Sequence, residues 1–282
     1  CIVPTVSGPR DQLETKAEIF PRAVERHEIA HPALPDALDG LEVLHIGDFH
    51  CGVGPAGRTF VDRLPALLCG FEVDLVVFVG DAMERPGDED RAIAALGACA
   101  GAWRSRHGAV GVFGNHDTGE LRDRAADELP GVRWLENTSA AIDIGGARLG
   151  VIGASDPQDV LGPALDLEHA DADFTIVAAH VPTAIYPAAS VGAGLVLAGH
   201  THGGQVRPSA RRVLKTSCDL SPGLATGLLR LDRTLCAITR GCGETVLDVR
   251  VNCPPQVAVL TLRRGPLPGD DGTAGLHRVL AW

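Results

Sequence analysis

The sequence is poor in aromatic residues and methionine, and it has no long apolar run. Aromatic residues make up 4% of the 282 positions, and Met83 is the single methionine. No stretch approaches the ~20 consecutive apolar residues that a transmembrane helix needs, which argues against a span within this sequence. We find no internal repeat or low-complexity tract. Because the chain begins with Cys1, we expect the native start to be missing, and an anchor or export signal could have been lost with it.

Cysteine spacing excludes one common class of metal site. The chain has no Cys-x-x-Cys pair, which disfavours a structural zinc site built on such pairs. We predict that most of the cysteines are small buried thiols rather than members of disulfides. The eight cysteines are Cys1, Cys51, Cys69, Cys99, Cys218, Cys236, Cys242 and Cys253.

Positive charge is also scarce. The formal net charge is −11, with 25 Lys and Arg against 36 Asp and Glu. Such a surface repels phosphate backbones on average, so we expect no nucleic-acid partner. The composition is otherwise that of a globular protein, with 45% hydrophobic and 22% charged residues. The length can bury a substantial core in one large α/β domain or in two small ones.

The first half of the chain alternates between apolar strand-like runs and helix-like segments. In one such segment, Ile93, Leu96 and Ala100 recur at helical spacing. This alternation predicts a mostly parallel sheet with helices on its faces. The expected strands are Leu41–Gly47, Leu75–Val79 and Val110–Phe113, and the expected helices are Gly57–Leu68 with a kink at Pro65, Arg91–Arg104 and Leu121–Leu129.

The second half is expected to be richer in strands. Gly145 and Gly146 predict a hairpin turn between two apolar runs. Two later runs read as buried strands, and three near the end suggest antiparallel pairing. The expected strands are Ala140–Ile144, Ala147–Ile152, Thr175–Ala179, Leu195–Ala198, Gly227–Leu231, Leu235–Thr239 and Val257–Leu262.

No convincing linker divides the chain, so we predict one α/β domain with two sheets, covering residues 38–263. Residues 1–37 are predicted to form an N-terminal extension that includes an edge strand at Ala23–Ile29. Residues 264–282 begin with a stretch rich in Gly, Pro and Asp, and we predict a loose C-terminal tail there.

Side chains that bind metals follow five of the predicted strands. In sheets of this kind, ligands gather just beyond the carboxyl ends of the parallel strands. We therefore expect these side chains to converge on one rim of the sheet. The five blocks are Asp48-Phe49-His50, Gly80-Asp81, Gly114-Asn115-His116-Asp117, His180 and Gly199-His200-Thr201-His202.

The residue types in these blocks predict a two-metal hydrolytic centre. Mixed nitrogen and oxygen donors suit Mn, Fe, Zn, Co or Ni better than Ca or Mg. Two such ions ~3.5–4 Å apart would stabilise the attacking and leaving oxygens of a phosphoryl displacement, with a metal-activated hydroxide as the nucleophile. The candidate ligands are Asp48, His50, Asp81, Asn115, His180, His200 and His202.

One histidine of the third block has a different predicted role. His116 is adjacent to Asn115 and would point another way, so we predict that it is the general acid that protonates the leaving-group oxygen. Asp117 is a weaker candidate for the residue that orients His116. Outside the blocks, Arg240 could hold a substrate phosphate or form a structural ion pair.

Taken together, the five blocks resemble the calcineurin-like metallophosphoesterase superfamily. The resemblance implies two mixed β-sheets packed as a sandwich and flanked by helices, with a binuclear metal centre. His116 would assist the leaving group. One ion would be held by Asp48, His50, Asp81 and His202, and the other by Asp81, Asn115, His180 and His200.

A narrower likeness, from about Glu25 to Leu262, is to the bacterial YkuE/YaeI-type phosphodiesterase branch. Members of that branch are often membrane-associated or exported, and some relatives cleave the pyrophosphate of a UDP-linked acylated sugar. Glu84 and Gln256 depart from the usual Asp and Glu, which leaves substrate preference open. The likeness lies in His200-Thr201-His202-Gly203-Gly204-Gln205-Val206, Leu38-Asp39-Gly40-Leu41, Thr239-Arg240-Gly241-Cys242-Gly243 and Cys253-Pro254-Pro255.

The sequence therefore predicts a metal-dependent hydrolase that cleaves phosphodiester or pyrophosphate bonds in a small-molecule, lipid-linked or nucleotide-sugar substrate. A phosphomonoesterase using the same site is the alternative. A non-catalytic module with the same fold would have lost ligands, and none is lost here. Peripheral membrane or cell-envelope association and a cytoplasmic location are both left open, as is the oligomeric state.

Overall fold

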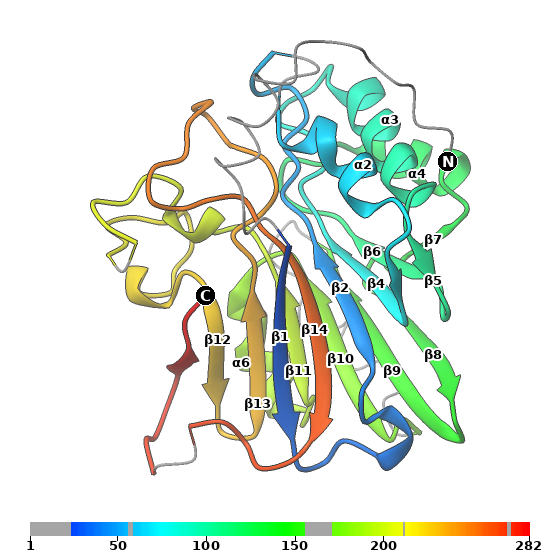
Figure 1. Ribbon diagram of the computed structural model, residues 1–282, viewed down its shortest axis with the longest axis vertical. Coiled ribbons are helices and arrows are strands. Elements are labelled where there is room, and N and C mark those ends of the chain that lie inside the picture. The colour runs from blue at the N-terminus through cyan, green and yellow to red at the C-terminus, as the bar shows by residue number, and fades with distance from the viewer. Residues whose placement is uncertain (1–23, 56–58, 156–170, 211, 270–271) are drawn as a thin grey trace.

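The computed structural model describes residues 24–55, 59–155, 171–210, 212–269 and 272–282. Its main feature is a pair of β-sheets packed face to face, with helices on the outside (Figure 1). Both sheets mix parallel and antiparallel strands, so the predicted fold class, a mixed α/β sandwich flanked by helices, is confirmed. No helix in the described part of the chain is both long and apolar enough to cross a bilayer.

The first sheet has six strands in the order β1-β14-β2-β4-β6-β7. Its core strands β2, β4, β6 and β7 run parallel to one another, whereas β14 is antiparallel to β2 and parallel to β1. The carboxyl ends of β2, β4, β6 and β7 therefore meet at one edge, and those of β1 and β14 lie at the other. The bounds are β1 (Val24–His31), β2 (Glu42–Ile46), β4 (Leu75–Val79), β6 (Ala109–Val112), β7 (Val132–Trp134) and β14 (Val257–Arg264).

The second sheet has seven strands in the order β15-β12-β13-β11-β10-β9-β8. Its central strands β9, β10, β11 and β13 are parallel, and antiparallel strands flank them. The predicted hairpin is confirmed as β8 and β9. The bounds are β8 (Ser139–Ile144), β9 (Ala147–Ala154), β10 (Phe174–Ala179), β11 (Leu195–Ala198), β12 (Gly227–Leu231), β13 (Thr234–Ile238) and β15 (His277–Leu280).

Helices cover the two outer faces of the sandwich. Residues of α2, α3 and α4 share a core with the first sheet, and α6 packs on the second (Figure 1). The helices are η1 (Asp36–Leu38), η2 (Val61–Arg63), α2 (Leu64–Leu68), α3 (Glu89–Ala100), α4 (Gly119–Glu128), η3 (Pro182–Ala184), α6 (Ile185–Ser190), η4 (His202–Gly204) and η5 (Pro222–Leu224), and a small sheet joins β3 (Glu72–Val73) to β5 (Arg104–Ser105).

Side-chain alternation along the buried strands explains the layers. Successive side chains of a strand point to opposite faces. On β4, Val76 and Phe78 join the core under the helices, while Val77 joins the core between the sheets. On β10, Ile176 faces the first sheet and Val177 faces α6. Both faces of these strands are buried, which is why their sequences are continuous apolar runs.

All three predicted helices have different bounds in the structure, and the one predicted as Leu121–Leu129 is α4, Gly119–Glu128. The segment predicted as Gly57–Leu68 is helical from Val61, and Gly57 lies outside the described residues. Pro65 does not kink this helix but lies in the first turn of α2, where its missing N–H breaks no helical hydrogen bond. The helix predicted as Arg91–Arg104 ends at Ala100, because Arg104 pairs in β5.

The chain ends also differ from the prediction. Residues 1–23 of the predicted extension lie outside the described residues, and the edge strand is β1. The loose tail predicted over residues 264–282 is wrong for His277–Leu280, which forms β15 against β12. Val279 packs toward the core between the sheets, and the Trp282 indole stacks on His27 with ring centroids 4.3 Å apart. This apolar contact anchors the C-terminal segment.

The late strands are less uniformly antiparallel than predicted. β12 and β13 form an antiparallel pair, but β13 is parallel to β11, and β14 belongs to the other sheet.

The cysteines agree with the thiol prediction: the seven described ones are free, and only Cys69 and Cys218 among them are not buried. Cys1 lies outside the described residues.

A buried polar cluster ties β1 to the segment after β13. The Arg240 side chain is almost fully buried, and its Nη2 donates to Glu25 Oε1 at 2.7 Å. Gln256 Nε2 donates to the other oxygen of Glu25 at 2.7 Å, and Gln256 Oε1 accepts from Arg240 N at 2.9 Å. Arg240 thus forms the structural ion pair rather than a free phosphate contact. Gln256 stands where the narrower likeness leads us to expect Glu, and its amide avoids a second carboxylate beside Glu25.

This cluster makes Glu25 important for stability. Burial alone would raise the pKa of the Glu25 carboxyl, but hydrogen bonds from His27 and Arg240 outweigh it and lower the pKa to about 2. We expect Glu25→Gln to lower the free energy of unfolding by about 1–3 kcal/mol at neutral pH, because the Arg240 cation stays buried without its carboxylate. Urea unfolding followed by circular dichroism measures the difference.

The pH dependence of that difference follows from the lowered pKa. The carboxylate contributes fully above the ordinary pKa of 4.5, and its contribution is lost as the pH falls toward about 2. The gap between wild type and Glu25→Gln should therefore narrow at pH 3. Glu28→Gln, on the same strand but in an exposed pair with Arg263, is the matched control and should cost less than about 0.5 kcal/mol. Equal stability of the two variants at pH 7 would contradict the prediction.

Candidate metal centre

The loops after five parallel strands meet at one edge of the sandwich. Asp48 and Asp81 follow β2 and β4, and Asn115 follows β6 in the first sheet. His180 directly follows β10, and the Gly199-His200-Thr201-His202 block follows β11 in the second sheet. The two sheets face each other, so their strand ends share one rim. All seven predicted ligands and His116 come together there.

A first cluster is formed by Asp48, His50 and His202. One ligand atom from each lies within 4.8 Å of the others, and all three residues are buried. The Nε2 atoms of His50 and His202 face each other at 2.9 Å. Asp48 Oδ1 accepts from the backbone N–H of His200 at 2.9 Å, while its Oδ2 is buried with no hydrogen-bond partner among the described residues. A cation is the partner that this oxygen fits.

A second cluster is formed by Asp81, His180 and His200, whose ligand atoms again lie within 4.8 Å of one another. His180 Nε2 lies 3.0 Å from Asp81 Oδ2, 3.1 Å from His200 Nδ1 and 3.2 Å from Asn115 Oδ1. Asp81 Oδ2 is also 3.3 Å from His50 Nε2 of the first cluster. One carboxylate oxygen therefore lies between the two clusters.

The buried carboxylates of this site favour the presence of positive charge beside them. Burial opposes protonation of His180 and His50, yet the carboxylate of Asp81 outweighs it in both cases and Glu84 adds to the effect on His50. The pKa of His180 is raised to about 10 and that of His50 to about 9. Buried carboxylates thus draw protons onto neighbouring imidazoles. Divalent cations would supply the same charge and displace those protons.

The backbone is strained at five of the seven predicted ligands. Their φ angles are positive, although none is glycine: Asp48 has φ 52°, His50 45°, Asp81 55°, His200 70° and His202 49°. This left-handed region is uncommon for residues with a Cβ, and such strain persists only where the surroundings hold it. It turns the chain sharply just after each strand, and it clusters at this rim.

Two glycines allow the carboxylates to lie against the backbone. A Cβ on Gly114 would come within 2.2 Å of Asp81 Oδ1, and one on Gly199 within 2.6 Å of Asp48 Oδ2. Neither neighbour can move without displacing a predicted ligand. Glycine is therefore required at these two positions, because the carboxylates lie too close to the backbone to leave room for a Cβ.

Outer hydrogen bonds orient three of the histidine rings. His50 Nδ1 donates to Glu84 Oε2 at 2.6 Å, and His180 Nδ1 donates to the carbonyl of Val79 at 2.8 Å. His200 Nε2 donates to the carbonyl of Ser217 at 3.1 Å. A ring nitrogen that donates outward leaves the opposite nitrogen directed at the centre, where a cation that displaces the proton would bind its lone pair.

Glu84 contacts the site, although the sequence reasoning did not assign it there. Besides His50, its carboxylate accepts from Val246 N at 3.0 Å and from Thr245 Oγ1 at 3.1 Å. It therefore links the first cluster to the loop that begins at Thr245. Burial opposes ionisation of Glu84, but the hydrogen bond from His50 lowers its pKa. The sequence signals were its place three residues after Asp81 and its departure from the Asp expected there.

His116 lies beside the first cluster and is partly exposed. Its ring centroid is 4.8 Å from that of His50, and its Nδ1 donates to the carbonyl of Glu84 at 2.6 Å. Nε2 is therefore the nitrogen left for proton transfer. The expectation that Asp117 orients His116 is wrong. Asp117 instead accepts from four backbone N–H groups, those of Gly114, Asp81 and Ala82 at 2.8–2.9 Å and that of Met83 at 3.4 Å.

The segment Gly241–Gly243, which contributed to the narrower likeness, packs against the back of the centre. Gly243 N donates to the carbonyl of Asp48 at 2.7 Å, and a Cβ on Gly243 would lie 1.8 Å from the carbonyl oxygen of Phe49. Arg250, which sequence reasoning missed, is buried beside it: its Nη2 donates to the carbonyl of Gly243 and lies 3.3 Å from His202 Nδ1. The motif therefore supports the first cluster from behind.

Curated proteins of similar sequence are named as metallophosphoesterases. A bovine protein named "Transmembrane protein with metallophosphoesterase domain" is 29% identical over 87% of this chain, which spans only 58% of that relative's length. The uncharacterized metallophosphoesterase YkuE of Bacillus subtilis is 25% identical over 84% of each chain. Among solved structures, the NAD nucleotidase NadN of Haemophilus influenzae has 15% identity and a TM-score of 0.48 over 71% of this chain and 45% of its own. We draw no functional conclusion from that partial likeness.

A family model matches more than half of the chain and assigns it to a family. The model for calcineurin-like phosphoesterases matches residues 41–204. This range runs from the residue before β2 to the end of η4, so it contains all five ligand blocks and the strands that carry them. The chain belongs to the calcineurin-like phosphoesterase family.

Proposed function

We propose that this phosphoesterase holds two divalent transition-metal ions, Mn, Fe or Zn, and cleaves phosphodiester or pyrophosphate bonds. The observation that carries the proposal is the position of Asp81 Oδ2, which lies 3.0 Å from His180 Nε2 and 3.3 Å from His50 Nε2. A carboxylate shared by two clusters of nitrogen and oxygen donors is suited to hold two cations close together. We further propose residues 38–263 as the catalytic domain.

Each ion would have its own set of donors, with Asp81 common to both. We assign the first ion to the first cluster and the second to the second cluster, where Asn115 adds a neutral carbonyl oxygen. Three of the histidines direct a ring nitrogen toward the centre, and the ions would take its lone pair in place of a proton. The proposed ligands are Asp48, His50, Asp81 and His202 for the first ion, and Asp81, Asn115, His180 and His200 for the second.

The protein's own groups would orient the substrate and move a proton. When bound, the ions would polarise phosphoryl oxygens and lower the pKa of a coordinated water. His116, held at Nδ1 by the carbonyl of Glu84, would carry a proton on Nε2 and give it to the leaving oxygen. Glu84 would keep the His50 ring in place from outside.

The favoured substrate is a small-molecule or lipid-linked phosphoester, such as a nucleotide sugar. The chain resembles a branch with relatives that cleave such a pyrophosphate, and its net charge of −11 disfavours a nucleic-acid substrate. We also propose association with a membrane or the cell envelope, for which the name of the bovine relative is the support.

The shared carboxylate gives the first test of this function. We expect Asp81→Asn to lower the hydrolysis of bis-p-nitrophenyl phosphate at least ~100-fold, because both ions lose a charged ligand. Elemental analysis of the purified protein should show fewer than two metal ions per chain. Asp90→Asn, which changes an exposed carboxylate on α3, should leave both readings as in wild type. Full turnover and metal content in Asp81→Asn would refute the assignment.

The acid role of His116 predicts a dependence on the leaving group. His116→Gln should lower kcat by ~10²–10⁴-fold for an alkoxide leaving group, which needs a proton. The loss should be much smaller for p-nitrophenolate, which departs readily without one. Metal content should not change, since His116 is not a proposed ligand. An equal loss with both leaving groups would exclude the acid role.

Comparison of monoesters with diesters separates the two hydrolase classes. At equal metal loading, we expect kcat/KM for bis-p-nitrophenyl phosphate to exceed that for p-nitrophenyl phosphate. Steady-state absorbance assays measure both. A strong preference for the monoester would replace the diesterase proposal with a phosphomonoesterase using the same residues.

A further inference from the structure

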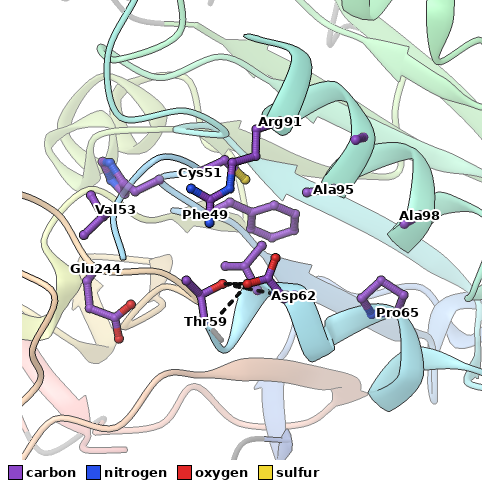
Figure 2. A pocket seen from close by; sticks show the side chains of 13 residues that line it. Phe49, Cys51, Val53, Thr59, Asp62, Pro65, Arg91, Ala95, Ala98 and Glu244 are labelled. Carbon is purple, nitrogen blue, oxygen red and sulfur yellow. Dashed lines mark hydrogen bonds between the residues drawn. The ribbon is translucent and has the colours of Figure 1, made fainter. Parts of the chain in front are cut away.

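A cavity of about 290 Å³ opens beside the proposed metal centre. It lies between the loop after β2, the η2–α2 segment and α3 (Figure 2). His50, Val53 and Glu244 line it at the side of the metal centre, and Figure 2 shows Ala98 and Pro65 at the opposite end. Its volume is close to the lower end of the ~300–1,000 Å³ found for small-molecule pockets.

The walls of this cavity are mainly apolar. Small side chains on the cavity side of α3 create the space, because larger residues there would fill it. Leu96 on the same helix packs into the core instead. Ala94 and Ala98 are solvent-exposed, so the cavity is open rather than a sealed packing defect. The apolar lining consists of Phe49, Val53, Val61, Pro65, Ala94, Ala95 and Ala98.

The polar groups in the lining are largely engaged with the protein. Thr59 donates to Asp62 Oδ2 from both its backbone N–H, at 2.9 Å, and its Oγ1, at 2.6 Å. Arg91 Nη1 contacts the carbonyl of Gly54 at 3.4 Å. Phe49, the only phenyl ring among the described lining residues, is buried edge-on against Phe78 and offers no stacking face. A nucleobase would find no exposed phenyl face to stack on among these residues, whereas an alkyl chain needs none.

A second cavity of about 270 Å³ adjoins the first and shares Val53 with it. Its lining is more polar, with the charged residues Glu84, Arg85 and Asp248 beside Gly52, Gly54 and Val246. Val246 and its neighbour Leu247 are 81% and 58% exposed. Val246 is held in place by the hydrogen bond from its backbone N–H to Glu84, so this apolar surface has a defined position relative to His50.

We propose that the cavity lined by Ala94, Ala95 and Ala98 is the subsite for an aliphatic substituent of the phosphoester substrate. The proposal rests on the proposed function, since it places the phosphoryl group at the metal centre. The alkyl chain then runs past His50 and Val53 toward Ala98. The substrate class is an amphiphilic phosphodiester or pyrophosphate with an aliphatic group near the cleaved bond.

Two diesters with a common leaving group test the subsite. The probes are methyl p-nitrophenyl phosphate and octyl p-nitrophenyl phosphate, the latter below its micelle concentration, with metal-loaded full-length protein. Each buried methylene favours binding by up to ~4-fold. We expect kcat/KM in wild type to be at least ~10-fold higher for the octyl ester. Ala98→Leu, which fills the distal end, should bring that ratio close to one and leave the methyl ester within ~2-fold.

Control variants and other outcomes keep the test decisive. Ala126→Leu, at an exposed alanine on α4 that does not line the cavity, should keep the wild-type ratio, and Ala94→Leu should reproduce Ala98→Leu. Equal rates for the two esters in wild type, or an equal loss of both in Ala98→Leu, would overturn the subsite proposal. The hydrolase assignment would stand in either case. Preference for thymidine 5′-p-nitrophenyl phosphate, lost in Ala98→Leu, would overturn it in favour of a nucleoside. Hydrolysis of none of the three would refute the proposed function itself.

Discussion

The Asp81 carboxylate organises the rim of the sandwich. One of its oxygens lies between His180 of one cluster and His50 of the other, and its second oxygen accepts the backbone N–H of His116. A buried carboxylate in this position is unfavourable unless positive charge surrounds it. That requirement accounts for the imidazoles drawn around it, and it is the physical reason to expect cations there.

The surrounding structure maintains this arrangement, although its backbone conformations are locally unfavourable. Left-handed backbone at Asp48 and Asp81 and the close approach at Gly114 are unfavourable locally. Parallel strands with both faces buried provide the rigid frame that maintains them. Asp117 binds the turn after β4 to the turn after β6 through backbone N–H groups. Glu84 connects His50 to the loop that begins at Thr245, so this loop and the first cluster share one hydrogen-bond network.

Much of the fold was predictable because buried parallel strands leave a strong local signal. Runs such as Leu75–Val79 and Leu195–Ala198 are continuously apolar and end at glycine, and the structure has them as β4 and β11. The seven candidate ligands were readable because strand order and polarity place them at one edge. Errors arose where distant contacts override local pattern. β15 forms because β12 offers an open edge, and Trp282 reaches His27, neither of which composition reveals.

The sequence by itself determined the family, the strand framework and the set of side chains able to bind metal, since these depend on local periodicity and on residue type. Tertiary structure alone decided how the pieces meet. It showed Arg240 paired with Glu25 rather than free, Asp117 bound to backbone, and Glu84 against His50. It also left an open cavity that extends from His50 to the alanines of α3. These contacts join residues far apart in the chain, and only the packing of two sheets and their helices brings such residues within hydrogen-bonding distance.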